Sequence, residues 1–488
     1  MFDYLWPIPQ KISASKEAKL FLSGSFSLKG KVPRNFKAGL KELGCKTGVK
    51  GLRVEFKISS SYKPEAYKLI VSASGILIRA GEEKGFFYAA ETLLQMIAYS
   101  LASGKMPFAE IEDRPAHKIR AFMVDLGRTT YSLKYLKRIV RIMARLKMNA
   151  LHVHLFDDQL FGIKLKNLPL GTENPAALTL SEFKELNAYA GRYYIEIIPE
   201  IEAWGHVGSI VYHYPEIKGG PGMYGSTSFL ISEQTLKLVE NITSQIVGVM
   251  PKKGIVHLGM DEANWYPSKE KSIEGMDPAK LVGVYSEMLE RINKKQKKNM
   301  RLCIWADHGG RPVPEKLKKK IIISPWNYWI RNKAKIEKAA KFYGGKGKAD
   351  ILLGAGMASE AQQRGAYDTT KLWATLGMKY PNILGVDVTY WGVNDIPLKL
   401  LSVFASFGFC WNPVAKSIPP AGDYETFDQY IAKKLLPWQL GFKDGRMDAL
   451  LKDMGEIVWQ GFYLTGKNCG KAAAITAEYN KTGYFGEV

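Results

Sequence analysis

The fold is decided by residues 119–158, which read IRAFMVDLGRTTYSLKYLKRIVRIMARLKMNALHVHLFDD. Two short apolar runs, Ile119–Asp125 and Ala150–Leu155, have the length of buried strands. Between them, Leu133–Leu146 repeats its apolar residues at helical spacing and carries lysines and arginines on the other face. The segment therefore predicts a strand, an amphipathic helix and a second strand.

The same alternation continues toward the C-terminus. Six further apolar runs are predicted as strands: Tyr194–Pro199, Ile255–Gly259, Arg301–Ile304, Ile321–Ser324, Ile351–Gly354 and Leu384–Thr389. Eight strands spread over roughly 270 residues predict an α/β fold of the (β/α)8 TIM-barrel type. The alternative is an open doubly wound sheet, which is disfavoured because no G-x-G-x-x-G motif follows the first strand.

The chain is predicted to have three parts. Residues 1–115 read as a small α+β domain, with a hairpin turn at Ala73-Ser74-Gly75 and a helix over Phe86–Leu101. Residues 116–423 form the barrel, and residues 424–488 form a short helical C-terminal region.

Composition excludes some classes of function. The 488 residues contain 69 Lys and Arg against 47 Asp and Glu, a net charge of +22. No nucleic-acid motif accompanies this charge, so we interpret it as solvated helix faces and loops, and we expect no nucleic-acid partner. A preference for anionic surroundings remains the less favoured alternative. We expect no membrane partner, because no apolar run has spanning length.

The cysteines and the N-terminus give little further information about function or compartment. The four cysteines are widely spaced, without the C-x-x-C pattern of a zinc site. The start of the chain lacks the charged-then-apolar pattern of a signal peptide. A chain shortened at its start would look the same, so the compartment stays open between cytoplasmic and secreted or periplasmic. The oligomeric state stays open too.

Ionisable and aromatic side chains gather where the predicted strands end. In a TIM barrel these ends build the active site. The candidates are Arg128, Asp157, Glu202, His206, His257, Asp261, Glu262, Trp305, Trp326, Tyr328, Trp329, Trp391 and Asp395. Taken singly, each tryptophan is better explained by core packing and each acid by a cap or ion pair. Crowded acids, however, raise one another's pKa, which prepares one carboxyl to act as a general acid.

A metal site is the alternative to acid–base chemistry at these residues. His152 and His154 lie on one face of a strand in an apolar stretch, and the chain has no H-E-x-x-H motif. Acid–base catalysis is favoured, and no metal and no cofactor are predicted.

Four ordered motifs carry a family resemblance. They are Phe87-Tyr-Ala-Ala-Glu-Thr-Leu-Leu-Gln95, Leu151-His-Val-His-Leu-Phe-Asp-Asp-Gln159, Ile198-Pro-Glu-Ile-Glu-Ala-Trp-Gly-His206 and His257-Leu-Gly-Met-Asp-Glu262. Together they resemble glycoside hydrolase family 20, the β-N-acetylhexosaminidases, over about residues 50 to 415. The resemblance implies a small α+β domain before a catalytic barrel. It also implies a glycan substrate with a terminal N-acetylhexosamine, and the substrate's own acetamido group as nucleophile.

The resemblance also implies residue roles. Glu262 would be the general acid and base, and Asp261 would hold the acetamido N–H. Arg128 and Asp395 would bind sugar hydroxyls, with Asp395 standing where the family usually has Glu. His206, with Asp157 or Glu202 behind it, would tune Glu262, and His257 would support them. The four tryptophans, Trp305, Trp326, Trp329 and Trp391, would wall the sugar pocket.

The chain departs from the family pattern at three further places. Met260 replaces the second glycine of H-x-G-G-D-E, and Glu202 stands where Asp is usual. The family's Tyr-Leu-Asp is absent after the seventh strand, so Tyr328 is the candidate for positioning the acetamido oxygen. These changes resemble the divergent, hexosaminidase-D-like branch. Two alternatives stay open: a retaining glycosidase with a carboxylate nucleophile, and a non-catalytic carbohydrate-binding barrel.

Overall fold

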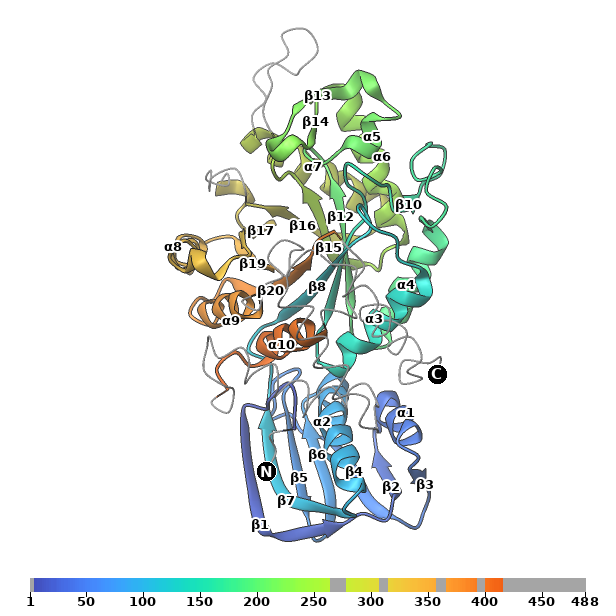
Figure 1. Ribbon diagram of the computed structural model, residues 1–488, viewed down its shortest axis with the longest axis vertical. Coiled ribbons are helices and arrows are strands. Elements are labelled where there is room, and N and C mark those ends of the chain that lie inside the picture. The colour runs from blue at the N-terminus through green and yellow to red at the C-terminus, as the bar shows by residue number, and fades with distance from the viewer. Residues whose placement is uncertain (1–3, 264–277, 307–314, 357–365, 393–399, 416–488) are drawn as a thin grey trace, which may run out of the picture.

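The computed structural model describes residues 4–263, 278–306, 315–356, 366–392 and 400–415. The first unit is a seven-stranded sheet in the order β1-β7-β5-β6-β4-β2-β3. Its strands are β1 (Lys11–Phe21), β2 (Ser25–Gly30), β3 (Lys46–Thr47), β4 (Leu52–Ile58), β5 (Tyr67–Ser72), β6 (Gly75–Ala80) and β7 (Lys105–Asp113). Helix α2 (Glu83–Leu101) packs on the sheet and α1 (Arg34–Glu42) packs on α2 (Figure 1).

Two predictions for this unit can be compared directly with the structure. The predicted hairpin is present: β5 and β6 are antiparallel, and Gly75 has a φ of 115°, which glycine adopts without strain. The predicted helix over Phe86–Leu101 begins earlier, at Glu83. Its first turn is polar, so the apolar periodicity did not reveal it.

The second unit is a closed barrel of parallel strands. They are β8 (Ile119–Asp125), β9 (Ala150–His154), β12 (Glu196–Glu202), β15 (Lys253–Gly259), β16 (Asn299–Trp305), β17 (Ile321–Ser324), β19 (Asp350–Gly356) and β20 (Ile383–Tyr390). Neighbours pair in chain order, β20 pairs with β8, and β17 pairs with β19, which closes the ring. The predicted TIM barrel preceded by a small α+β domain is confirmed.

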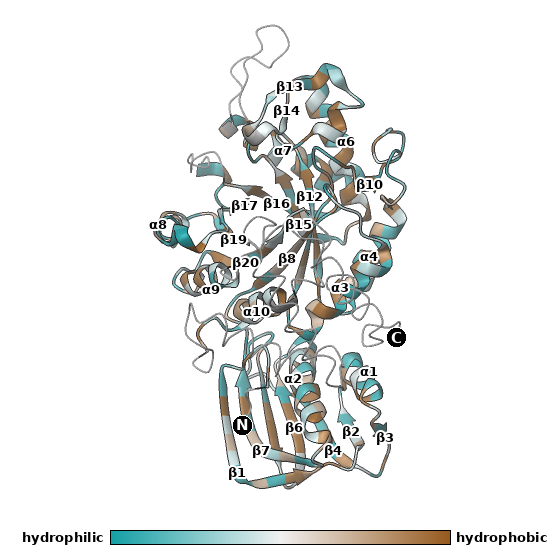
Figure 2. Cartoon of the chain, viewed as in Figure 1, coloured by the Kyte–Doolittle hydropathy of each residue, from teal (hydrophilic) through white to brown (hydrophobic). Residues whose placement is uncertain are grey.

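Helices surround the barrel strands, except the short α5 (Gly208–Val211), which lies beside β14 (Thr227–Phe229) in the connection after β12 (Figure 1). The surrounding helices are α3 (Leu133–Arg145), α4 (Leu180–Gly191), α6 (Glu233–Val249), α7 (Pro278–Gln296), α8 (Lys333–Tyr343), α9 (Ala366–Gly377) and α10 (Leu400–Trp411). Side chains fix where several begin. The Ser132 hydroxyl caps α3, and Thr179 and Glu182 form a reciprocal capping box on α4. The barrel strands are predominantly hydrophobic, whereas the helices mix both characters (Figure 2).

Among the described residues, five short strands lie in the connections between the main elements. They are β10 (Ile163–Lys164), β11 (Leu178–Thr179), β13 (Lys218–Pro221), β14 (Thr227–Phe229) and β18 (Trp326–Asn327). The antiparallel pair of β13 and β14 lies in the long connection between β12 and α6.

The prediction for the third barrel strand was wrong at both ends. Tyr194 has a φ of 57° and belongs to the turn after α4, so the strand begins two residues later. It also continues through Pro199 to Glu202. Glu200 and Glu202 therefore project from the strand itself, inside the barrel, and both are fully buried.

A buried polar cluster joins the two units. The Lys147 ammonium donates to Asp113, Tyr67 and Thr92, with an Nζ–Oδ2 distance of 2.9 Å to Asp113. The Trp411 indole donates to the same carboxylate. Because all of these groups are satisfied, the contact between sheet and barrel is a specific one.

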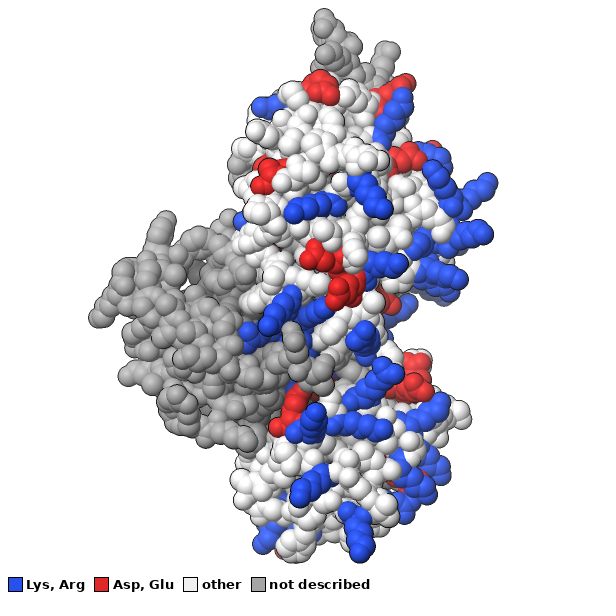
Figure 3. All heavy atoms as spheres, turned by 90° about the vertical axis from the view of Figure 1, so that its right-hand side faces the viewer, with Lys and Arg blue, Asp and Glu red and all other residues white. Residues whose placement is uncertain are grey.

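Two sequence expectations concern the surface and the end of the chain. Lysines and arginines outnumber acids on the face shown in Figure 3, which includes α3 and α4. No helix among the described residues is long and apolar enough to cross a membrane. The predicted helical region, 424–488, lies outside the described residues.

Candidate active site

The barrel interior changes from apolar to ionisable along its strands. Every second residue of a barrel strand faces inward. One inward layer is an apolar cluster formed by Ala121, Ala150, Ile198, Ile255, Cys303, Ile322 and Leu352. Two residues further along four of these strands stand His152, Glu200, His257 and Trp305, all buried. The alternation predicted for His152 and His154 thus places both imidazoles inside the barrel.

Glu200 is the centre of this ionisable layer. One of its oxygens accepts from His154 Nδ1 at 2.7 Å and lies 3.2 Å from His152 Nε2. The other accepts from the Trp305 indole and lies 3.1 Å from His257 Nδ1. Burial disfavours a charged Glu200, but the surrounding imidazoles hold its pKa well below the usual range.

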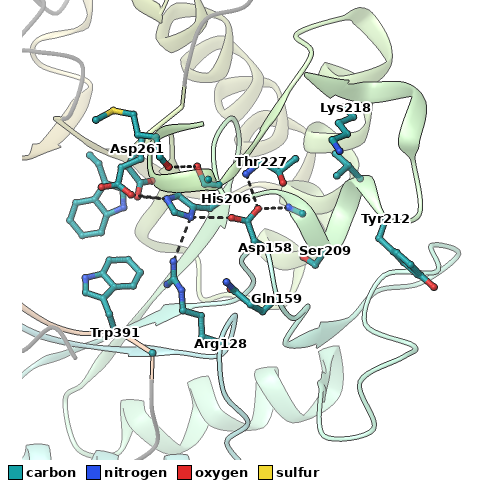
Figure 4. Close-up of a pocket in the computed structure, with 18 of the residues that line it drawn as sticks. Arg128, Asp158, Gln159, His206, Ser209, Tyr212, Lys218, Thr227, Asp261 and Trp391 are labelled. Atoms are coloured by element: carbon teal, nitrogen blue, oxygen red, sulfur yellow. Dashed lines mark hydrogen bonds and ion pairs between the residues drawn. The ribbon is translucent and has the colours of Figure 1, made fainter. Parts of the chain in front are cut away.

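Above this layer, the loops after β9, β12 and β15 bring Asp157 and His206 together with the neighbouring acids Asp261 and Glu262. His206 Nε2 lies 3.3 Å from Glu262 Oε2 and 3.7 Å from Asp261 Oδ2. Its Nδ1 lies 3.2 Å from Asp157 Oδ1. His206 therefore links the predicted acid, Glu262, to Asp157. Figure 4 shows His206 with its contacts to Asp158 and Arg128.

The backbone at this junction is unusual. His206 and Glu262 both have positive φ, 53° and 49°, in loops that follow β12 and β15. Such conformations cost about 1–3 kcal/mol each and cluster at functional sites. Gly205 lets the loops approach, since a Cβ there would lie 2.1 Å from the Asp261 carbonyl oxygen.

Asp261 is the buried member of the acidic pair. Burial raises its pKa to about 6, with His206 opposing this shift and Glu200 adding to it. Its Oδ1 is buried without a hydrogen-bond partner among the described residues. A buried acceptor of this kind favours a ligand that donates an N–H or O–H.

Charges around His206 keep it protonated. Burial opposes the charge, but Asp157, Asp158 and Glu262 raise the pKa of His206 far above its usual value. Burial likewise opposes ionisation of Asp157, yet hydrogen bonds from His154 and His206 and the charge of Arg128 lower its pKa. The result is a stable ion-paired cluster next to Glu262.

Arg128 stands on the other side of Asp157. Its guanidinium nitrogens lie 2.9 Å from Asp125 Oδ2 and 2.7 Å from Asp157 Oδ2. The guanidinium also lies over the Trp391 ring, 5.3 Å from its centre. Its side chain is a quarter exposed and faces the cavity, so its orientation is fixed while donors stay accessible.

Aromatic rings form one wall of the cavity. The Trp391 indole donates to the Tyr328 hydroxyl at 3.0 Å, and Trp326 stacks on the Tyr328 ring. Gly356 makes room for this ring, since a Cβ there would overlap it. Trp305 and Trp329 complete the wall. The four predicted tryptophans and Tyr328 are therefore brought together.

The cavity has a volume of about 1290 Å³ and contains most of the predicted residues. Arg128, His206, Asp261, Glu262, Trp305, Trp326, Tyr328, Trp329 and Trp391 line it. Asp157, Glu202 and His257 lie beneath, fully or almost fully buried. Asp395 lies outside the described residues. Met260 packs in the hydrophobic core.

Of the two carboxylates considered behind His206, the structure places Asp157 in contact with it. Glu202 instead lies 3.7 Å from His154 and fills the space above Gly259, where a Cβ would collide with its carboxyl group. Burial, reinforced by Asp261 and Glu200, raises the pKa of Glu202 well above its usual value. This environment favours the neutral form of Glu202.

The sequence analysis missed the outer wall, which the segment 208–227 forms. Tyr212, Lys218 and Thr227 from this segment line the cavity (Figure 4). Asp158 anchors the segment by accepting from the backbone N–H groups of Gly208 and Thr227 at 2.8 and 3.1 Å. The length of the connection between β12 and α6 could have indicated this wall, because unusually long connections in compact domains are often functional.

Three groups within the described residues bring potential metal ligands close together. They are His152 with Glu200 and His257, His154 with Glu200 and Glu202, and Asp157 with Asp158 and His206. A metal needs a nitrogen free of its proton. Both nitrogens of His152, His154 and His206 face carboxylates, so hydrogen bonding and ion pairing are the better use of these groups.

Known proteins are similar to this chain in sequence and architecture. The profile of glycosyl hydrolase family 20, domain 2, matches residues 4–114, and that of the catalytic domain matches residues 117–343. A β-N-acetylhexosaminidase of Cellulomonas fimi is 24% identical over 421 residues, covering 78% of this chain and 80% of that protein. A β-hexosaminidase of Akkermansia muciniphila is 30% identical over 224 residues, 41% of this chain.

Some of these relatives are matched over only part of their length. The matches to solved structures show that the fold is the same and no more. The chain covers 29% to 48% of the β-hexosaminidases of Porphyromonas gingivalis, Vibrio furnissii and Akkermansia muciniphila. A chitobiase of Flavobacterium johnsoniae has a TM-score of 0.70 at 20% identity, covering 93% of this chain and 77% of that one. An exo β-N-acetylglucosaminidase of Vibrio harveyi has a TM-score of 0.69 at 21% identity, with 90% and 77% covered. With both domain profiles matched in order and the barrel closed, the chain belongs to glycosyl hydrolase family 20.

Proposed function

We propose that the chain is an exo-acting β-N-acetylhexosaminidase that removes terminal GlcNAc or GalNAc from glycans with retention of configuration. The observation that carries the proposal is the pair of adjacent acids after β15. Both line a tryptophan-walled cavity, and His206 contacts both of them.

In the proposed mechanism, the substrate supplies the nucleophile. The oxygen of its 2-acetamido group attacks the anomeric carbon, while the bond to the leaving oxygen breaks and Glu262 gives that oxygen a proton. An oxazolinium ion forms. Since the nucleophile is already attached beside the reaction centre, little further entropy is lost.

Asp261 assists the attacking amide. Its unpaired Oδ1 would accept the acetamido N–H, and its negative charge would stabilise the cation as it forms. Tyr328, which lines the same cavity, would hold the acetamido oxygen. The second step reverses the first: water attacks the anomeric carbon and returns a proton to Glu262.

The remaining residues position the sugar. Arg128 would donate to hydroxyls at the non-reducing end, because its guanidinium is fixed by two carboxylates and still faces the cavity. The tryptophan wall would cover the apolar face of the ring. Asp395 is proposed to bind outer hydroxyls.

The experiment identifies the anomer that is released first and tests whether a mimic of the intermediate inhibits the reaction. Hydrolysis of aryl N-acetyl-β-glucosaminide and galactosaminide should release the β-anomer first, as seen by proton NMR, and a thiazoline that mimics the bicyclic ion should inhibit competitively. Labelling of a protein carboxyl by a 2-fluoro sugar would instead indicate a carboxylate nucleophile. Binding without turnover across both substrates would indicate a non-catalytic barrel.

A further inference from the structure

The ion-paired cluster beside Glu262 does not stop at Asp157. Asp157 Oδ2 lies 3.0 Å from His154 Nε2, and His154 Nδ1 lies 2.7 Å from Glu200 Oε2. The same Glu200 oxygen lies 3.2 Å from His152 Nε2, and His152 Nδ1 lies 2.6 Å from Asp387 Oδ2. Carboxylates and imidazoles thus alternate without interruption from the cavity into the barrel interior.

The geometry favours positive imidazoles in this chain of groups. His206 and His154 each lie within hydrogen-bond distance of two carboxylates. His152 is hydrogen-bonded to Asp387 through Nδ1, and its Nε2 lies 3.2 Å from Glu200. The pKa values agree in direction. Burial works against the charge, but Asp387 and Glu200 raise the pKa of His152 to about 9, and Glu200 and Asp125 raise that of His154 well above its usual value.

Fold stability does not account for these groups. Barrel interiors are normally filled by branched apolar side chains. Buried ion pairs lose solvation that their mutual attraction often fails to recover, and apolar replacements are commonly as stable. His152, His154, Glu200 and Asp387 are nearly or completely inaccessible, so the loss of solvation is severe here.

The chain of groups places positive charge beside a general acid. Three imidazoles alternate with the carboxylates of Asp157, Glu200 and Asp387. When Glu262 releases its proton, the new negative charge appears next to His206, which is already charged and already oriented. His206 also faces Asp158, Asp261 and Arg128, which belong to the loops after β9, β15 and β8.

We propose that His154, Glu200, His152 and Asp387 are positioning residues for the reaction, which keep His206 charged and oriented beside Glu262 from within the barrel. Glu200 has a second task, because it also accepts from the Trp305 indole and so fixes one wall of the cavity. No net proton passes along these groups in a cycle, since the attacking water returns the proton that Glu262 gives away. The inference rests on the proposed function.

The kinetic test is Glu200→Gln, which keeps the shape and an acceptor but removes the charge. For glycosides with a poor leaving group, kcat/KM should fall about 10- to 100-fold, the usual effect of groups that orient a catalytic residue. For a dinitrophenyl glycoside, whose leaving group needs no proton, the fall should stay below about threefold. Asn187→Ala is the control: it removes a buried hydrogen bond to the Phe183 carbonyl on helix α4, outside the ring of strands, and should change kcat/KM for both substrates by the same factor.

A second measurement needs neither activity nor a variant. The chain has seven histidines, so histidine-selective ¹⁵N labelling gives a countable spectrum. At pH 7.5, the rings of His152, His154 and His206 should be doubly protonated, while those of His117 and His257 should be neutral because burial lowers their pKa values.

These measurements separate failure of the inference from failure of the proposed function. An inactive wild-type chain would reject the function and leave the spectrum as the test. An active chain whose Glu200→Gln variant loses both activities equally would overturn the inference alone. Neutral rings at His152 and His154 in the folded wild type would overturn it as well.

Discussion

Replacing Asp261 by Asn should stabilise the protein above pH 6 while removing its activity. Folding raises the pKa of this carboxyl from 3.8 to about 6 through burial. A shift of about two units corresponds to roughly 3 kcal/mol at 1.36 kcal/mol per unit. A raised carboxyl pKa means that the native state resists ionisation, so this penalty is absent below pH 3.8 and complete above pH 6.

The assay is urea unfolding at pH 4, 5, 6 and 7.5, comparing midpoints of variant and wild type. The Asn variant should gain nothing at pH 4 and about 1–3 kcal/mol at pH 7.5, with the gain growing between these values. Glu287→Gln, an exposed change on α7, is the control and should shift the midpoint little at any pH. A gain that is equal at pH 4 and 7.5, or absent at both, would refute the picture of Asp261 as a carboxylate held ionised at a cost in stability.

Three further outcomes are expected. Glu262→Gln should lower kcat/KM about 10²- to 10⁴-fold for poor leaving groups and far less for dinitrophenyl glycosides, as stopped assays can show. Lys147→Met should lower the free energy of unfolding by about 3–5 kcal/mol, because the buried Asp113 carboxylate loses its cationic partner, and Asp113→Asn added to it should recover part of the loss. Tyr212, 79% exposed on the outer wall, should contact sugars beyond the first ring, so Tyr212→Ala should raise KM about three- to tenfold for a tetrasaccharide but not for an aryl monosaccharide.

The sequence predicted the barrel because its signals are local. The runs at Ile119–Asp125 and Ile321–Ser324 match the observed strands residue for residue, since their buried residues are continuous and their ends are polar. The third strand was misplaced because a proline in an apolar run looks like an ending, whereas β12 accommodates Pro199 and continues.

The site was predicted less completely than the fold. Asp261, Glu262, Arg128 and His206 follow strands directly, so the fold alone brings them to one end of the barrel. The choice between Asp157 and Glu202 behind His206 depended on side-chain direction, which spacing in the sequence does not give. Tyr212 and its segment were missed because that connection has no periodic pattern.

The groups beneath the cavity illustrate the same limit. His152 and Glu200 were visible in the sequence as residues of two strands, but their partnership requires the register in which β9 and β12 are adjacent. Asp387 comes from β20, more than 200 positions away in the chain, at 2.6 Å from His152. Closure of the ring, rather than any local motif, brings them together.

The most direct measurement of the central claim compares an aryl N-acetyl-β-glucosaminide with the matching aryl β-glucoside, which differs only at position 2. If the substrate's acetamido oxygen is the nucleophile and Asp261 guides it, the first compound is hydrolysed and the second is turned over at least about 10³-fold more slowly. Comparable kcat/KM values for the two would contradict the account.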